Sequence, residues 1–188
     1  TCILFGDGAG ALVLQASEKP GGVLSAVMHS DGSGGNLLTL AAGGSRHPAT
    51  EATIREGQHY IYMDGKEVFR FATKVMVQST EEVLKSVGLT KNDVKVIIPH
   101  QANARIIEAA ARGLKLPMDR FVVNVDRYGN TSTASIPIAT VEAIETGRVQ
   151  AGDKVVFVGL GAGLTWGALV AEWTGPLPSP RKINVGRY

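Results

Sequence analysis

Apolar and polar positions follow two different periods along the chain, and these periods predict its helices and strands. Three segments carry apolar residues three and four positions apart, as on one face of a helix: 64–88, 103–115 and 132–146. Short continuous apolar runs, which are typical of buried strands, occupy 2–5, 11–15, 23–28, 94–98, 121–125, 154–158 and 166–173. Because strands and helices alternate through the middle of the chain, we expect an α/β fold with a largely parallel, helix-covered sheet.

Capping residues mark the ends of the predicted helices. Asp64 is a candidate N-cap, and Glu67, three residues on, would complete a capping box. Gly88 closes this helix, and Asn103 caps the next one. Pro137 stands early in the third helix, where its missing N–H costs least.

The segments outside these elements indicate one domain followed by a tail. Residues 30–60 are rich in Gly, Ser and Thr and show no clear period, which is typical of a loop that is functional or covers something. The Pro-containing tail, 174–188, is predicted to be extended. We therefore expect a single domain over 1–173.

Composition narrows the function classes. Hydrophobic residues make up 44% of the chain and charged residues 19%, which favours a packed core over disorder. The net charge of +2 argues against a nucleic-acid partner, and the absence of an 18-residue apolar run argues against a membrane span. A single cysteine, Cys2, excludes an internal disulfide, favours a reducing compartment and is expected to be a buried thiol. Because the chain begins inside an apolar run, we expect a fragment, a processed chain or an omitted N-terminus.

Two polar junctions at strand ends are candidates for chemistry. His100 follows the run 94–98, where an imidazole can donate to an oxyanion or move a proton, although a structural histidine bonded to backbone is the alternative. Asn130 lies in a Gly-Asn-Thr junction, which indicates either a plain turn or an amide donor beside the histidine. The other histidines lie in or near the irregular region and carry less weight: His29, His47 and His59.

A glycine-rich junction at 159–163 follows the run 154–158. It invites comparison with a dinucleotide-binding loop, but such a loop must lead into a helix N-terminus. The residues that follow, 164–170, indicate a strand instead. A tight turn that directs a backbone N–H into a pocket is the better interpretation.

The predicted helix at 103–115 has two unlike faces. Its apolar side comprises Ile106, Ile107, Ala110 and Leu114, and its polar side comprises Arg105, Glu108, Arg112 and Lys115. The polar side is either an ordinary solvated face or a docking face for an acidic partner.

Four segments taken together resemble β-ketoacyl-acyl-carrier-protein synthase III. Residues 99–105, Pro-His-Gln-Ala-Asn-Ala-Arg, are similar to the family's histidine motif, and residues 128–132, Tyr-Gly-Asn-Thr-Ser, to its asparagine motif. Residues 5–11 and 159–167 are similar to two further family segments, in the same order and spacing. The resemblance covers residues 1–173.

The resemblance implies a thiolase-like fold, in which two similar α/β halves pack as αβαβα layers in a homodimer. This chain would be the C-terminal half, with the link from the N-terminal half inside residues 1–60. The implied reaction takes a short acyl group, acetyl above all, from coenzyme A onto a cysteine. Malonyl-acyl-carrier-protein then loses CO₂ and condenses with that acyl group, which initiates fatty-acid synthesis. No cofactor and no metal are implied, coenzyme A thioester being a substrate, and the implied compartment is the cytoplasm or the plastid stroma.

The resemblance also assigns roles to individual residues. His100, neutral and with its proton on Nε2, and Asn130 would donate hydrogen bonds to the enolate oxygen, and the Ala162 backbone N–H would form half of an oxyanion hole, although the family often has Gly there. Contacts to substrate or coenzyme A are implied for Ala102, Asn103, Met63, Gly65 and Leu160, the last as a gate that is often Phe in the family. Docking of acyl carrier protein is implied for Arg105, Arg112 and Lys115.

The chain departs from the family pattern at the nucleophile. The family's cysteine lies in an Ala/Cys/Gly-rich segment of the N-terminal half, which this sequence lacks, and Cys2 matches no catalytic position. We therefore expect the chain alone to be inactive and to need the N-terminal half, in the same or another chain. Two alternatives remain: a related synthase that makes a secondary metabolite from other acyl thioesters, and a non-catalytic half-domain that binds carrier protein or stabilises a partner chain.

Overall fold

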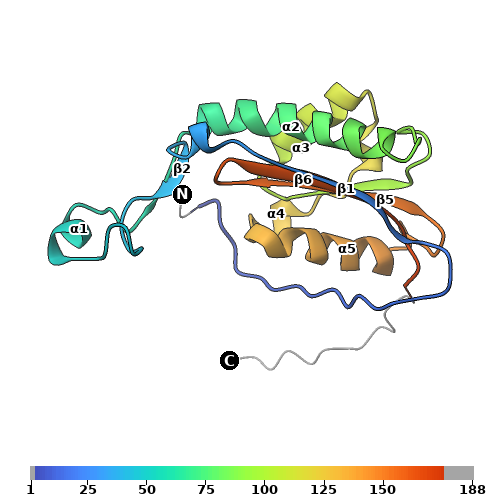
Figure 1. Cartoon of the computed structure of the whole chain (residues 1–188), viewed down its shortest axis with the longest axis horizontal. Helices are drawn as coiled ribbons and strands as arrows, with labels where there is room; N and C mark the ends of the chain where they lie inside the picture. Colours follow the sequence, from blue (N-terminus) through green and yellow to red (C-terminus); the bar gives the residue numbers. More distant parts are fainter. Residues whose placement is uncertain (1–2, 176–188) are drawn as a thin grey trace.

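The computed structural model describes residues 3–175, and its centre is a four-stranded sheet with helices on both faces (Figure 1). The strand order is β1-β6-β5-β4, with β1 at Gly22–Ser30, β4 at Val96–Pro99, β5 at Lys154–Gly161 and β6 at Thr165–Glu172. Only β4 and β5 are parallel, whereas β6 pairs antiparallel with both β5 and β1. The prediction of a largely parallel sheet is wrong because β5 and β6 form a hairpin, and a short turn can join only antiparallel strands.

The helices lie in two layers. In Figure 1, α2 (Gly65–Lys85) and α3 (Ala104–Leu114) lie above the sheet, and α4 (Val125–Tyr128) and α5 (Ser135–Glu145) lie below it. Single 3₁₀ turns occur at Gly32–Gly34, Met118–Arg120 and Ser132–Ala134. One sheet between two helical layers is the arrangement expected for the C-terminal half of a thiolase-like fold.

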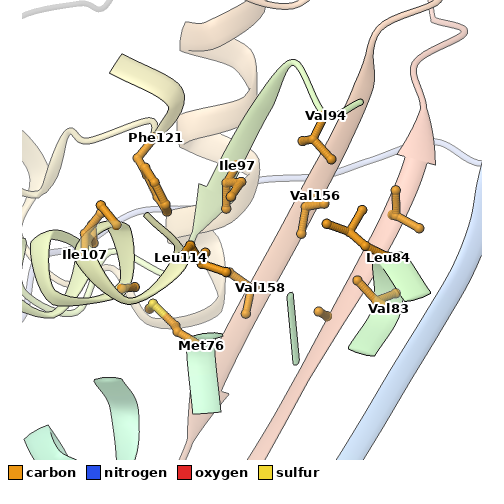
Figure 2. Close-up of a cluster of buried hydrophobic side chains, with 14 of the residues drawn as sticks. Met76, Val83, Leu84, Val94, Ile97, Ile107, Leu114, Phe121, Val156 and Val158 are labelled. Carbon is orange, nitrogen blue, oxygen red and sulfur yellow. The ribbon is translucent and has the colours of Figure 1, made fainter. Parts of the chain in front are cut away.

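Both faces of the sheet are buried, which explains the continuous apolar runs of β4 and β5. Successive residues of a strand point to opposite faces. Figure 2 shows Ile97, Val156 and Val158 in the cluster that the sheet forms with α2 and α3. The residues that alternate with them belong to a second cluster between the sheet and α5, which comprises Val96, Ile98, Val122, Ala139, Ala143, Ile144, Val149 and Val155.

The predicted caps of α2 and α3 are confirmed, but the capping box is only half formed. Asp64 accepts a hydrogen bond from the Glu67 backbone N–H at 3.1 Å, and Asn103 caps α3 through its side-chain oxygen. The Glu67 carboxylate does not return the bond, because the Asp64 N–H donates to the Leu37 carbonyl oxygen at 2.8 Å. Glu67 pairs with Arg70 instead, at 3.2 Å.

Residues 30–60 are more ordered than their composition predicts. With the residues that follow, they form an extension in which β2 (Leu38–Leu40) pairs antiparallel with β3 (Ile61–Met63). The short helix α1 (Glu51–Arg55) lies at its far end, at the left of Figure 1. Elements of three to five residues are too short to show a period, so the sequence gives no sign of them.

Three predicted strands do not form. Of the run 2–5, Cys2 lies outside the described residues, and Phe5 makes only a single bridge with Asn130. Residues 11–15 have no strand beside them in the described chain, and Val13 remains 91% exposed. The run 121–125 is reduced to one bridge from Phe121 to Ile97, because α4 begins at Val125. An apolar run becomes a strand only where another strand pairs with it.

The predicted tail lies outside the described residues from 176 onward.

The N-terminal segment packs tightly against the start of the asparagine junction. A Cβ atom at Gly6 would overlap the carbonyl oxygen of Tyr128. Gly129 adopts φ 67° and ψ −164°, a conformation that is essentially restricted to glycine. A Cβ atom there would lie 3.3 Å from both the Gly6 nitrogen and the Leu4 oxygen.

We predict that Gly129→Ala lowers the free energy of unfolding by about 3 kcal/mol, because it combines backbone strain with crowding. Gly88→Ala is the matched control: Gly88 has φ 68°, and nothing lies within 4 Å of its ideal Cβ position. The control should cost about 1 kcal/mol. Urea unfolding of the two variants measures the difference, and equal costs would contradict the role given to Gly129.

Candidate active site

A cleft of about 1400 Å³ opens at the edge of the sheet where β4 and β5 end. The eight residues with an implied catalytic or substrate-contact role all line this cleft: Met63, Gly65, His100, Ala102, Asn103, Asn130, Leu160 and Ala162. They come from the extension, from the starts of α2 and α3, from the asparagine junction and from the β5–β6 hairpin. Residues far apart in the sequence therefore meet in one place.

His100 is held by its backbone and by its ring. Its N–H donates to the Val158 carbonyl oxygen at 2.8 Å, which extends the β4–β5 ladder past the end of β4. Its Nδ1 lies 2.7 Å from the Ser135 hydroxyl oxygen, whereas Nε2 has no hydrogen-bond partner among residues 3–175. Burial lowers the pKa of His100 below its ordinary value, so the ring is neutral at pH 7.

Asn130 is oriented by its neighbours. Its backbone N–H donates to the Leu4 carbonyl oxygen at 2.9 Å, and its carbonyl oxygen accepts from the Gly6 N–H at 3.0 Å. Its side-chain oxygen accepts from the Ser132 N–H at 2.9 Å. The oxygen end of the amide is thus occupied, and the NH₂ end remains as the donor for the cleft.

Ala162 lies in the turn between β5 and β6. The strands extend further than the sequence predicts, so Gly159 and Gly161 belong to β5 and only 162–164 form the turn. Asp31 secures this turn by exchanging two backbone hydrogen bonds with Leu164, at 2.7 and 2.8 Å. The Ala162 N–H donates to no acceptor within the described part of the chain.

The β5–β6 hairpin differs from a dinucleotide-binding loop. A strand, β6, follows the glycine-rich turn, and no helix N-terminus faces it from residues 164–172. The prediction that this segment is a turn and not a dinucleotide loop is confirmed.

The three basic residues of α3 lie apart from the cleft. Arg105, Arg112 and Lys115 are exposed, and the opposite face of the helix is buried, as the spacing predicts. None of the three forms an ion pair with another described residue. They therefore lie on the exposed side of the segment that begins at the cleft-lining Asn103, and none of them lines the cleft.

Sequence reasoning missed an aromatic cluster in the cleft wall. His29 stacks near Trp166, with ring centroids 5.6 Å apart, and Phe71 meets the same indole edge-on at 5.3 Å. His29 also contacts Glu82 at 2.8 Å. The β1–β6 register that brings His29 opposite Trp166 leaves no local signal in either segment. His47 and His59 lie outside the cleft, on the extension.

Residues 3–175 show neither a metal-binding cluster nor a membrane-spanning helix. They contain no group of three His, Cys, Asp or Glu side chains placed to hold a metal ion. None of their helices combines the length and the apolar character needed to cross a membrane.

Comparison with known proteins places this site in a family. Residues 84–173 match the model of the 3-oxoacyl-[acyl-carrier-protein (ACP)] synthase III C terminal, and residues 1–32 match that of 3-oxoacyl-[acyl-carrier-protein (ACP)] synthase III. The chain belongs to this family. The segments that carry His100, Asn130 and Ala162 all fall inside the first match.

Relatives and solved structures agree with this membership. The chain is 50% identical over 174 residues to beta-ketoacyl-[acyl-carrier-protein] synthase III of Roseiflexus sp. (strain RS-1), covering 93% of this chain and 53% of that one. It is 52% identical to the protein of the same name from Symbiobacterium thermophilum, covering 92% and 52%. The crystal structure of 3-oxoacyl-[acyl-carrier-protein] synthase III from Aquifex aeolicus VF5 superposes with a TM-score of 0.80 at 42% identity, covering 92% and 51%. The chain thus spans about half the length of the relatives it matches.

We predict that the His100 imidazole titrates with a midpoint below the ordinary value of about 6.5, because burial disfavours the charged ring. The unfolded state then binds the proton more readily, so stability is lost as the pH falls through the unfolded pKa. NMR titration of the histidine ring signals, with His100→Gln to identify the resonance, measures the midpoint. A midpoint at or above the ordinary value would contradict the prediction, as would an unchanged acid-side loss of stability in His100→Gln.

Proposed function

We propose that this chain carries the histidine and asparagine half of a β-ketoacyl-acyl-carrier-protein synthase III. The reaction would be the decarboxylative condensation of an acyl-coenzyme A, acetyl-coenzyme A above all, with malonyl-acyl-carrier-protein. One observation carries the proposal: His100 and Asn130 line the same cleft, and the atoms they leave without a hydrogen-bond partner among residues 3–175 are Nε2 of the ring and the NH₂ of the amide, because Nδ1 contacts Ser135 and the amide oxygen accepts from the Ser132 N–H. Membership of the family supports the reaction class.

The two donors suit the decarboxylation step. Loss of CO₂ breaks the bond between the carboxylate carbon and the α-carbon of the malonyl thioester, and the electron pair moves into an enolate whose negative charge rests on the thioester oxygen. Hydrogen bonds from His100 and Asn130 to that oxygen would stabilise the enolate. Preorganised donors of this kind contribute about 3–4 kcal/mol each in other enzymes.

The second step joins the enolate to the acyl group. The enolate carbon attacks the carbonyl carbon of an acyl group held as a cysteine thioester, and the carbon–sulfur bond then breaks to release the thiolate. The Ala162 N–H would stabilise the tetrahedral oxygen that forms in between. We assign the cysteine to the N-terminal half of the family fold, because the one cysteine of this chain, Cys2, matches no catalytic position.

Exposed apolar surface supports a covering N-terminal half. Val13, Leu14 and Met28 are 91%, 83% and 86% exposed, and β1 is an edge strand of the sheet. Surfaces of this kind are normally buried by another element or chain. We assign them to contacts with the N-terminal half, within an enzyme that works as a homodimer in the cytoplasm or a plastid stroma.

The substrate contacts follow the cleft wall. Ala102, Asn103, Met63 and Gly65 would contact coenzyme A or pantetheine, and Leu160 would limit the acyl pocket. We infer no resident cofactor, because the substrate thioesters and the assigned cysteine supply all the reacting atoms.

A second candidate is a synthase that starts a polyketide. The priming beta-ketosynthase from the R1128 polyketide biosynthetic pathway superposes with a TM-score of 0.70 at 32% identity, covering 85% of this chain and 47% of that one. The same histidine and asparagine chemistry would serve both functions, so a panel of acyl-coenzyme A primers separates them. The higher identity to the Roseiflexus relative favours fatty-acid initiation.

We predict that His100→Ala and Asn130→Ala, in the full-length protein that carries this chain, each slow malonyl-carrier decarboxylation by about 100-fold or more. Acylation by radiolabelled acetyl-coenzyme A should persist, because neither residue is the nucleophile. His47→Ala is the control, since the His47 ring bonds only the Ala41 carbonyl oxygen among residues 3–175 and lies outside the cleft. Loss of acylation with decarboxylation intact would contradict the proposed roles.

We predict that Arg105→Glu weakens the binding of acyl carrier protein by about tenfold at low salt, and by less as salt screens the charge. Arg55→Glu makes the same charge change on α1, at the far end of the extension from α3 (Figure 1). Titration calorimetry with the full-length protein measures both. Equal weakening by the two variants would count against a specific docking surface on Arg105, Arg112 and Lys115.

Binding of carrier protein by a protein that never becomes acylated would favour a non-catalytic half-domain.

A further inference from the structure

Ser135 lies behind the cleft, in contact with the catalytic candidate His100. It is the first residue of α5 and is 2% exposed. Its hydroxyl oxygen lies 2.7 Å from His100 Nδ1 and 3.2 Å from the Gln101 backbone nitrogen. Ser135 therefore meets two consecutive residues of the histidine junction with one atom.

The available protons determine whether Ser135 or His100 donates the hydrogen bond between them. The Gln101 N–H can only donate, so it occupies one lone pair of the Ser135 oxygen. The single hydroxyl proton of Ser135 has one acceptor within the described residues, namely His100 Nδ1. If Nδ1 carried the ring proton instead, the buried hydroxyl proton would have no acceptor, which is unfavourable.

We propose that Ser135 is a positioning residue that donates its hydroxyl proton to His100 Nδ1 and thereby keeps the ring proton on Nε2. The tautomer is a property of this chain alone. Its consequence for catalysis rests on the proposed function, which uses the Nε2–H as a donor to the enolate oxygen.

The surrounding structure holds this contact in place. The side chain of Gln101 is 1% exposed, donates to the carbonyl oxygens of Pro99 and Val122 at 2.9 and 3.0 Å, and accepts from the Asn124 N–H at 2.9 Å. These bonds fix the backbone at Gln101, so its N–H points steadily at Ser135. Such buried and fully bonded networks are rigid.

The same segment of chain controls both donors of the cleft. Asn130 is oriented by the Ser132 N–H, and the 3₁₀ turn Ser132–Ala134 leads directly into Ser135. A shift of this segment would disturb the amide of Asn130 and the ring of His100 together. Ser135 therefore couples the histidine to the asparagine junction.

The test reads the tautomer directly, by the ¹⁵N chemical shifts of the histidine rings in the full-length protein that carries this chain. In the unsubstituted protein, His100 should show a protonated Nε2 and an unprotonated Nδ1. Ser135→Ala should shift the ring toward a mixture of tautomers, whereas Ser135→Thr, which keeps the hydroxyl, should preserve the original state. Ser79→Ala is the matched control, because Ser79 is 1% exposed and its hydroxyl has no partner within residues 3–175.

Activity gives the second measurement. Ser135→Ala should lower kcat for malonyl-carrier decarboxylation by about ten- to a hundredfold, the range seen when the orienting partner of a metal-bound histidine is removed. KM and acylation by acetyl-coenzyme A should change little, and Ser135→Thr should restore the rate.

The outcomes separate the two proposals. An Nδ1 proton in the unsubstituted protein, or a tautomer ratio that Ser135→Ala leaves unchanged, overturns the role of Ser135. Should Ser135→Ala fail to fold, the tautomer of the unsubstituted protein decides the matter. If the tautomer shifts as expected while His100→Ala leaves decarboxylation intact, the positioning role stands and the proposed function fails.

Discussion

The parallel pairing of β4 with β5 is the constraint on which the rest of the site depends. Pro99 lies beside Val158 in this pairing, and the next residue, His100, donates its backbone N–H to the Val158 carbonyl oxygen. The ladder therefore positions His100 before its side chain makes any contact. Because parallel strands end at the same edge of a sheet, this pairing also brings the β5–β6 turn to the histidine. Burial of both faces between two helical layers keeps the two strands in register.

The opposite wall of the cleft is supported by a single bridge instead of a sheet. Phe5 pairs with Asn130, and the approach is so close that a Cβ atom at Gly6 would overlap the Tyr128 carbonyl oxygen and one at Gly129 would crowd the Gly6 nitrogen. Asn130 thus depends on residues from the start of the chain, whereas His100 depends on the central sheet. Ser135 connects the two supports, because it continues the segment of Asn130 and contacts the ring of His100.

The sequence predicts correctly those features that depend on neighbouring residues alone. The caps at Asp64 and Asn103 and the two faces of α3 depend on neighbours within a few residues, and these predictions are confirmed. Strand formation at 11–15 and 121–125 depends on a distant partner strand, and there the apolar runs were misleading. The motifs located His100 and Asn130, but the contact of Ser135 with His100 and the register of His29 with Trp166 arise only from tertiary packing.

The cleft presents donors because the accepting atoms of its polar residues are already occupied. Asn103 and Asn130 each accept a backbone N–H through their side-chain oxygens, and in the proposed tautomer His100 Nδ1 accepts from the Ser135 hydroxyl. In the proposed reaction, the malonyl carboxylate is an anion before decarboxylation, so a cationic imidazolium would stabilise the ground state and oppose the loss of CO₂. Burial lowers the pKa of His100 and keeps the ring neutral. The hydrogen bond from a neutral N–H is strongest to the thioester oxygen, because that oxygen gains negative charge in the transition state. The transition state is then bound more tightly than the ground state, and this difference accelerates the reaction.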